Sequence, residues 1–260
     1  LEETAKIYKI LKEFDKAELY YQRANIKNPI YLEPLQKLVS LYDIMNDFEK
    51  KLEVLKKMDA LSSVNHQRKI EIGHTYIKLD QEEKGKEYFQ QAIKQVRKEA
   101  KDMLSHAYME IAQKVKDERP ELCSQYIAKA IETKGSYLTR KDLWMFNEIG
   151  ISLRRENKWE EAIRYYKRAL EFAPMEAGLY YNIGVAYAQG KKFYKAIKNF
   201  LKALEINPEI IKETPSIPYN IAISYVEIEH FDEAIKFLNK SLELDPEYEP
   251  AKKLKARISG

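Results

Sequence analysis

The side chains that most often carry chemistry are few and widely spaced in this chain of 260 residues. It has four histidines, and the two nearest in sequence, His66 and His74, are eight positions apart. On one helix that spacing directs two side chains about 80° apart, a poor arrangement for holding one metal ion. Neither His-Glu-x-x-His nor Cys-x-x-Cys, the common zinc patterns, occurs. The sequence therefore predicts no metal site.

Other catalytic groups also have a structural explanation. No glycine-rich phosphate loop occurs. The single cysteine, Cys123, falls at a packing position of a helical pattern, which favours a structural thiol over a nucleophile. Acid pairs such as Glu82-Glu83 stand at the starts of expected helices, where carboxylates interact favourably with the helix dipole. We therefore expect neither an enzyme nor a cofactor.

Charge is weak over the whole chain but uneven along it. The formal net charge is +4, whereas residues 151–200 carry ten Lys and Arg against five Glu. A nucleic-acid site would need these cations on one face, interleaved with aromatic rings. Lysine at outward helix positions is also a common solubilising choice, so we favour a solvated face and keep nucleic-acid binding as the alternative. The basic stretch comprises Arg154, Arg155, Lys158, Arg164, Lys167, Arg168, Lys191, Lys192, Lys195, Lys198 and Lys202.

Composition is that of a helix-rich protein with no membrane partner. Hydrophobic residues make up 45% of the chain and charged residues 33%, with only 8 glycines. No apolar run approaches the ~20 residues that span a bilayer, and no secretory signal is visible. A single cysteine agrees with a reducing compartment, so we expect a cytoplasmic protein. Leu1 falls inside a helical pattern, which predicts that the chain is part of a longer protein.

Two stretches near the end of the chain are almost the same. Residues 179–187 read Leu-Tyr-Tyr-Asn-Ile-Gly-Val-Ala-Tyr, and residues 217–225 read Ile-Pro-Tyr-Asn-Ile-Ala-Ile-Ser-Tyr. Each is followed by Ala-Ile-Lys and then by a Leu-Glu segment that closes on Pro208 or Pro246. Repetition at a fixed period predicts a stack of small units, with function on a continuous surface.

The period runs along the whole chain. A position that favours a small residue recurs every 34 to 39 residues, at Ala17, Lys51, Gly85, Cys123, Ala162, Ala196 and Ala234. Two antiparallel helices pack closely only where one side chain is small, so each unit is expected to be a helix pair. Lys51 does not fit this rule, and the fourth unit, with Cys123 and no closing proline, is degenerate.

This pattern resembles the tetratricopeptide repeat. The resemblance is strongest in the sixth unit, at Tyr180, Ile183, Gly184, Tyr187, Ala196, Phe200, Ala203 and Pro208. It implies an all-α right-handed superhelix forming one domain over 1–260. The expected units are 1–31, 32–65, 66–102, 103–134, 139–176, 177–210 and 214–248, with an end helix at 248–258. Longer steps place short insertions near 116–120, 134–141 and 209–216.

In this family the first helix of each unit lines a concave groove, and the resemblance implies the same here. Asn182 and Asn220 recur at one repeat position, preceded by Tyr181 and Tyr219. With Asn147 and Arg154 they are the candidate groove residues. The asparagines can bond the backbone of an extended peptide, or they can bond a neighbouring helix, and both interpretations stay open.

No Lys or Arg pair accompanies these asparagines, so we expect no carboxylate clamp of the chaperone-cofactor kind. The sequence predicts a scaffold that binds a protein or peptide partner, and it leaves self-association open. Leu52–Lys57 and Tyr180–Gly184 also resemble, loosely, repeat arrays that follow receiver domains in bacterial response regulators. That resemblance implies a role in bacterial signalling.

Overall fold

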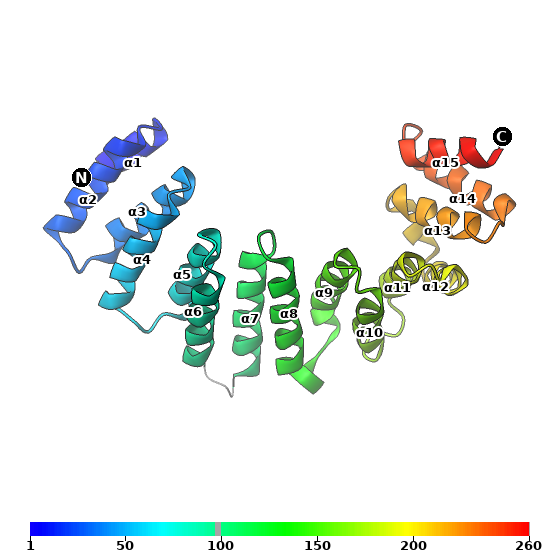
Figure 1. Ribbon diagram of the computed structural model, residues 1–260, viewed down its shortest axis with the longest axis horizontal. Coiled ribbons are helices and arrows are strands. Elements are labelled where there is room, and N and C mark those ends of the chain that lie inside the picture. Colours follow the sequence, from blue (N-terminus) through cyan, green and yellow to red (C-terminus); the bar gives the residue numbers. More distant parts are fainter. Residues whose placement is uncertain (97–99, 260) are drawn as a thin grey trace. The chain divides into compact units, whose positions relative to one another are not determined.

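The computed structural model describes residues 1–96 and 100–259, and every regular element in these ranges is a helix (Figure 1). The prediction of an all-α protein is confirmed. Residues 97–99 of the third expected repeat, and Gly260, lie outside the described ranges. The chain divides into two compact units, Leu1–Lys134 and Gly135–Gly260, and each is described by itself. A single array over 1–260 stays a prediction.

The first unit consists of four helix pairs, in which each helix packs against the next along the chain. Short turns join the two helices of a pair. The helices are α1 (Glu2–Ile10), α2 (Phe14–Lys27), α3 (Leu32–Met45), α4 (Phe48–Leu61), α5 (His66–Lys78), α6 (Glu82–Gln95), α7 (Lys101–Val115) and α8 (Pro120–Lys134).

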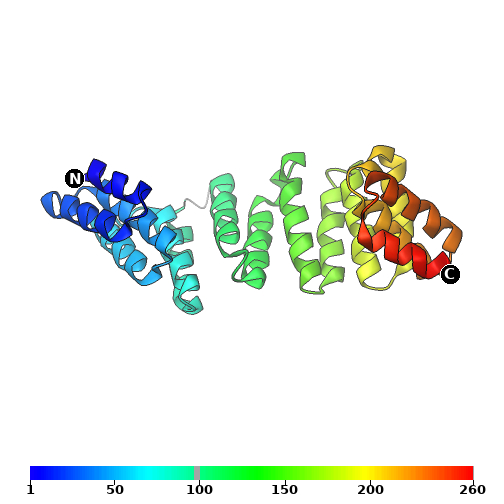
Figure 2. The ribbon, with the colours of Figure 1, turned by 90° about the horizontal axis from the view of Figure 1, so that it is seen from above.

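The second unit repeats the design, with three pairs and a last helix (Figures 1 and 2). Short 3₁₀ helices occupy the expected insertions near 134–141 and 209–216. In order, the elements are η1 (Gly135–Tyr137), η2 (Arg140–Asp142), α9 (Leu143–Arg155), α10 (Trp159–Leu170), α11 (Ala177–Gln189), α12 (Phe193–Ile206), η3 (Pro208–Lys212), α13 (Ser216–Val226), α14 (Phe231–Leu244) and α15 (Glu249–Ser259).

The turn inside a pair has one recurring conformation. Among the described residues, six that are not glycine adopt φ between 55° and 62°, each just after a first helix. The amide of the following residue donates to the carbonyl five positions earlier, as in Lys192 to Tyr187 at 2.8 Å and His230 to Tyr225 at 2.9 Å. This bond closes the helix end and reverses the chain. The six residues are Lys12, Asn46, Asp80, Asn157, Lys191 and Glu229.

Glycine appears where a ring of the second helix reaches the first helix. A Cβ added to Gly184 would lie 2.5 Å from the Phe200 ring and 3.1 Å from the carbonyl oxygen of Ala196. Gly150 meets the ring of Tyr166 in the same way, at 2.2 Å. Gly184 therefore faces Ala196 across the helix pair, and Phe200 is the closer neighbour.

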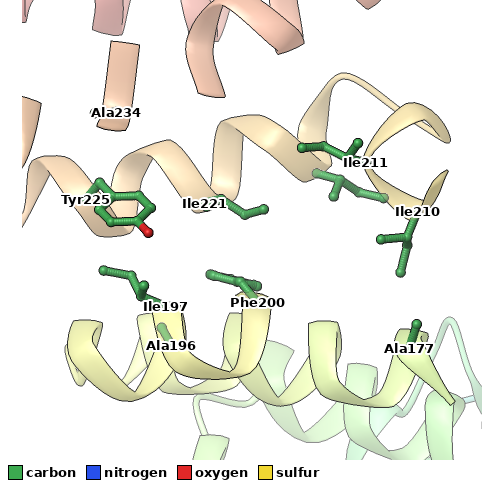
Figure 3. Packing of buried hydrophobic residues seen from close by; sticks show 10 residues of the cluster. Ala177, Ala196, Ile197, Phe200, Ile210, Ile211, Ile221, Tyr225 and Ala234 are labelled. Atoms are coloured by element: carbon green, nitrogen blue, oxygen red, sulfur yellow. The ribbon is translucent and has the colours of Figure 1, made fainter. Parts of the chain in front are cut away.

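The core of the second unit lies between successive pairs. Ala196, Ile197 and Phe200 of α12 face Ile221 and Tyr225 of α13 (Figure 3). The insertion before α13 also contributes, because Ile210 and Ile211 of η3 are buried in the same cluster. The insertion is therefore part of the core that positions α13.

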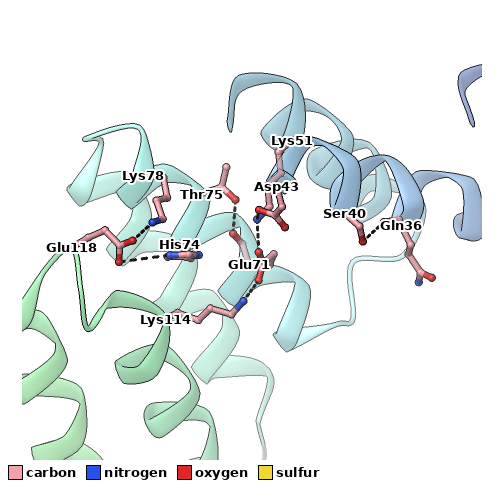
Figure 4. A network of polar contacts seen from close by, with 10 residues as sticks. All are labelled: Gln36, Ser40, Asp43, Lys51, Glu71, His74, Thr75, Lys78, Lys114 and Glu118. Atoms are coloured by element: carbon pink, nitrogen blue, oxygen red, sulfur yellow. Dashed lines mark hydrogen bonds and ion pairs between the residues drawn. The ribbon is translucent and has the colours of Figure 1, made fainter. Parts of the chain in front are cut away.

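Lys51, the exception to the small-residue rule, is buried with 2% exposure. Its Nζ lies 2.5 Å from Asp43 Oδ1 and 2.5 Å from Glu71 Oε1, and Lys114 binds the other Glu71 oxygen at 2.6 Å (Figure 4). Carboxylates from α3 and α5 thus compensate the buried charge of Lys51. Cys123 is buried, as its packing position predicts.

Candidate partner-binding strip on the first helices

The six candidate residues lie on three successive first helices of the second unit. Asn147 and Arg154 are on α9, Tyr181 and Asn182 on α11, and Tyr219 and Asn220 on α13. All six are half-buried, with part of each side chain open to solvent. We call this set the first-helix strip.

Hydrogen bonds join the strip from helix to helix. Asn182 donates through Nδ2 to Asn147 Oδ1 at 3.1 Å, and Asn220 donates through Nδ2 to the Tyr181 hydroxyl at 2.7 Å. The bond to a neighbouring helix, one of the two interpretations of these asparagines, is therefore present. Binding of a partner's backbone stays a prediction. The bonds fix the amide planes, so their other polar atoms are held in defined directions.

The remaining amide atoms are available to a partner. Asn147 Nδ2, Asn182 Oδ1 and Asn220 Oδ1 form no hydrogen bond with another described residue. Because an amide group carries two donors and two acceptor sites, each asparagine retains bonding capacity beyond its helix contact. Together they offer one amide donor group and two acceptor oxygen atoms along the strip.

Arg154 supplies an uncompensated positive charge. Its Nε is buried without a hydrogen-bond partner, and no carboxylate among the described residues forms an ion pair with it. Burial raises the pKa of Tyr166, and the neighbouring Arg154 cation opposes that rise. Burial also raises the pKa of Tyr181, while the Asn220 hydrogen bond and the charge of Arg154 oppose it. The positive charge of Arg154 on α9 therefore reaches Tyr181 on α11, the residue next to Asn182.

Both tyrosines of the strip pack against another aromatic ring. Tyr181 packs against Phe200 with ring centroids 5.5 Å apart. Tyr219 meets Tyr248 edge to face at 5.6 Å. These contacts fix both rings before any partner binds, so little side-chain entropy remains to be lost on binding.

The basic stretch lies mostly on the second helices α10 and α12 and their preceding turns. Lys191, Lys192, Lys195 and Lys198 are exposed, as expected for a solvated face. Others are partly neutralised: Lys158 pairs with Glu156 at 2.6 Å and Lys202 with Glu205 at 2.8 Å. Only Arg154 of this stretch belongs to the strip.

Sequence reasoning missed a cleft of about 410 Å³ between α13 and α15. Its lining includes Tyr219, Ile223 and Val226 from α13 and Leu254 from α15. The signal was present, since positions 219, 223 and 226 fall on one face of a helix. Tyr219 was predicted to lie in the groove, but Ile223 and Val226 were not, because apolar residues at that spacing are the ordinary mark of a core.

Within residues 1–96 and 100–259, no group of three or more His, Cys, Asp or Glu side chains is placed to hold a metal ion. Nor does any helix in those ranges have the length and apolar character needed to cross a membrane.

Comparison with known proteins supports the repeat assignment. Models described as TPR repeat and tetratricopeptide repeat match residues 150–190, 177–210, 68–95 and 218–248. No related protein was found among curated sequences.

Solved structures with a TM-score of 0.50 or above share the fold. The C-terminal part of a TPR repeat-containing protein from Cytophaga hutchinsonii superposes with TM-score 0.63 at 16% identity, covering 97% of this chain and 98% of that one. One chain of the APC/C hetero-tetramer Cut9–Hcn1 gives 0.50 at 16% identity, over 95% of this chain and 46% of that one. YrrB, described as a TPR protein with an unusual peptide-binding site, gives 0.43 at 18% identity, over 91% and 97%. The chain is thus an all-α protein in which residues 68–95, 150–210 and 218–248 match tetratricopeptide repeats.

Proposed function

We propose that the chain is a non-enzymatic scaffold for protein–protein interaction, which holds an extended segment of a partner protein along the first-helix strip. In this proposal the free amide atoms of Asn147, Asn182 and Asn220 bond the backbone of the segment. Tyr181 and Tyr219 cover its side chains. A cytoplasmic location and a place in bacterial signalling remain predictions from the sequence.

Arg154 is the observation that carries the proposal. A half-buried guanidinium whose Nε has no hydrogen-bond partner is costly, because a buried donor loses its bonds to water. A carboxylate of a partner segment, placed at the open part of this half-buried side chain, would supply the opposite charge. Packing explains the glycine, alanine and large apolar positions of the repeat, but it does not require this cation.

The test compares affinities for a partner captured from the source cells and then purified. We expect Asn182→Ala with Asn220→Ala to weaken binding by ~1–3 kcal/mol together. Arg154→Gln should weaken binding further for an acidic segment and lower its dependence on salt.

Because both asparagines also bond neighbouring helices, the double variant will lose some stability. Asn207→Ala is the control: it removes the 3.1 Å N-cap bond that the Glu209 amide donates to Asn207 Oδ1 at the start of η3, and neither residue belongs to the strip. It should lower the stability of the same unit while leaving affinity unchanged. Equal affinity of all variants, with the fold intact by circular dichroism, would place the partner elsewhere.

A further inference from the structure

The cleft between α13 and α15 has a fixed apolar floor. Leu254 is buried with 7% exposure in a cluster with Ala222, Leu238 and Ala251. Ile223 and Val226 pack against that same cluster and are half-buried. One side of each residue therefore contacts the core, while another side lines the cleft.

The two walls of the cleft differ in charge. On α15, Lys253 and Arg257 are exposed, and the nearest carboxylate to Lys253 Nζ is that of Glu249 at 3.9 Å. Arg257 forms no ion pair with a described residue. At the end of α13, Glu227 lines the opposite wall and is likewise unpaired within the described chain. An occupant therefore meets two cations on one side and one carboxylate on the other.

We propose that this cleft binds a segment of a partner protein in which a large apolar side chain lies next to an acidic side chain. The apolar group would rest on Ile223, Val226 and Leu254, and the carboxylate would face Lys253 and Arg257. Charge complementarity selects this occupant, because a basic side chain at that place would meet like charge. The proposal rests on the proposed function and names the chemistry of the partner at the C-terminal end of the strip.

The carboxylate of Glu227 favours one orientation of a bound segment over the other. A segment bound the opposite way round would bring its acidic group toward the Glu227 carboxylate, where like charges repel. Removing that carboxylate should therefore improve binding of an acidic segment, whereas reversing a charge on α15 should weaken it. These opposite effects distinguish recognition of charge from simple burial of an apolar group.

The probes are three acetylated, amidated tetrapeptides: Ser-Phe-Asp-Ser, the same peptide with Lys for Asp, and the same peptide with Ser for Phe. Binding to the whole chain is followed by ¹³C-methyl NMR of Ile223, Val226 and Leu254. We expect the Phe-Asp peptide to shift these methyl signals and to bind about fivefold tighter than the other two. Glu227→Gln should tighten its binding, and Arg257→Glu should abolish the preference for Asp. The matched control is Lys236→Glu, which makes the same charge change at an exposed residue of α14 and should have no effect on peptide binding.

Equal affinity for the Asp and Lys peptides, or no methyl shifts at millimolar peptide, would overturn the proposal. So would shifts that depend on protein concentration alone, which would indicate a second copy of the chain in the cleft. If the captured partner is sensitive to Arg154→Gln but not to Arg257→Glu, the cleft proposal fails while the proposed function stands. If the peptides bind here but strip variants leave the partner's affinity unchanged, the strip fails and the cleft remains.

Discussion

Lys51 Nζ lies 2.5 Å from Glu71 Oε1, although Lys51 is buried and occupies a position that the repeat reserves for a small residue. Breaking a buried ion pair by removing one partner leaves an uncompensated charge, which costs ~3–5 kcal/mol. Asp43 Oδ1 also lies 2.5 Å from Lys51 Nζ and remains in Glu71→Leu, so we expect this variant to lower the free energy of unfolding by less, ~1–3 kcal/mol. Chemical denaturation measures it.

The double variant Lys51→Met with Glu71→Leu is the control for this pair. Replacing both charges with apolar groups of similar volume is often neutral, so the double variant should be more stable than Glu71→Leu alone. Lys51→Met alone completes the comparison. If the loss of stability in the double variant equals the sum of the losses in the two single variants, Lys51 and Glu71 are not energetically coupled and their ion pair does not stabilise the fold.

Glu71 also predicts how stability responds to strong acid. Burial would raise its pKa, but Lys51 and Lys114 outweigh burial and lower the pKa to about 2. A carboxyl group with a lowered folded-state pKa stabilises the fold above its unfolded pKa, near 4.3, and loses that contribution as pH falls through the folded value. Unfolding measured between pH 5 and about 2 should show this loss in the parent and much less of it in Glu71→Leu.

His74 predicts a separate effect at milder pH. Burial lowers its pKa, and neither ring nitrogen has a hydrogen-bond partner, although Glu118 Oε2 lies 3.9 Å from Nε2. The folded protein therefore binds this proton less readily than the unfolded chain, whose histidine pKa is about 6.5. Stability should fall as pH drops below that value, in a range where Glu71 remains ionised. His74→Asn should flatten the dependence between pH 6.5 and 5, and an unchanged slope would mean that another group titrates there.

Gly184 tests the register of the helix pairs. Gly184→Leu would force a side chain against the Phe200 ring, and we expect it to destabilise the protein by ~1–3 kcal/mol or more. Gly178, on the same helix α11, has no atom within 4 Å of an added Cβ. Gly178→Leu should therefore be tolerated. Equal thermal unfolding of the two variants would show that the contact between α11 and α12 is assigned wrongly.

The exposed lysines of α12 and of the turn before it test the alternative function. If they form a solvated face, single-stranded RNA and duplex DNA should bind no better than ~10⁻⁴–10⁻⁶ M at physiological salt. Fluorescence anisotropy at several salt concentrations measures this. Tight, salt-sensitive binding that is lost on reversing Lys191, Lys192, Lys195 and Lys198 would instead support a nucleic-acid scaffold.

The helix pairs could be predicted because their signals are local. Small residues such as Ala196 and rings such as Phe200 recur at one period, and the structure places Gly184 against both. The turns inside the helix pairs were harder to predict. Lys191 and Glu229 adopt positive φ there, where a glycine would have been the recognisable signal.

The polar contacts could not be read from the sequence. The Lys51–Glu71 pair joins residues 20 positions apart, and the Asn182–Asn147 bond joins residues 35 apart. Such pairs depend on how one repeat stacks on the next, which periodicity does not specify. The candidate asparagines could be named from their recurrence. Which of their polar atoms bond a neighbouring helix, and which remain for a partner, could not be predicted.

Site-specific photo-crosslinking tests the central claim most directly. Benzoylphenylalanine would replace Tyr219, in the strip on α13, or Tyr194, which is 72% exposed on second helix α12. Both changes substitute one aromatic side chain for another. The two variants therefore match in chemistry and differ only in whether the crosslinker lies on a first helix or on a second helix. We predict that the purified partner crosslinks at position 219 and not at position 194. Crosslinking at 194 alone would contradict the account and place the binding surface on the second helices.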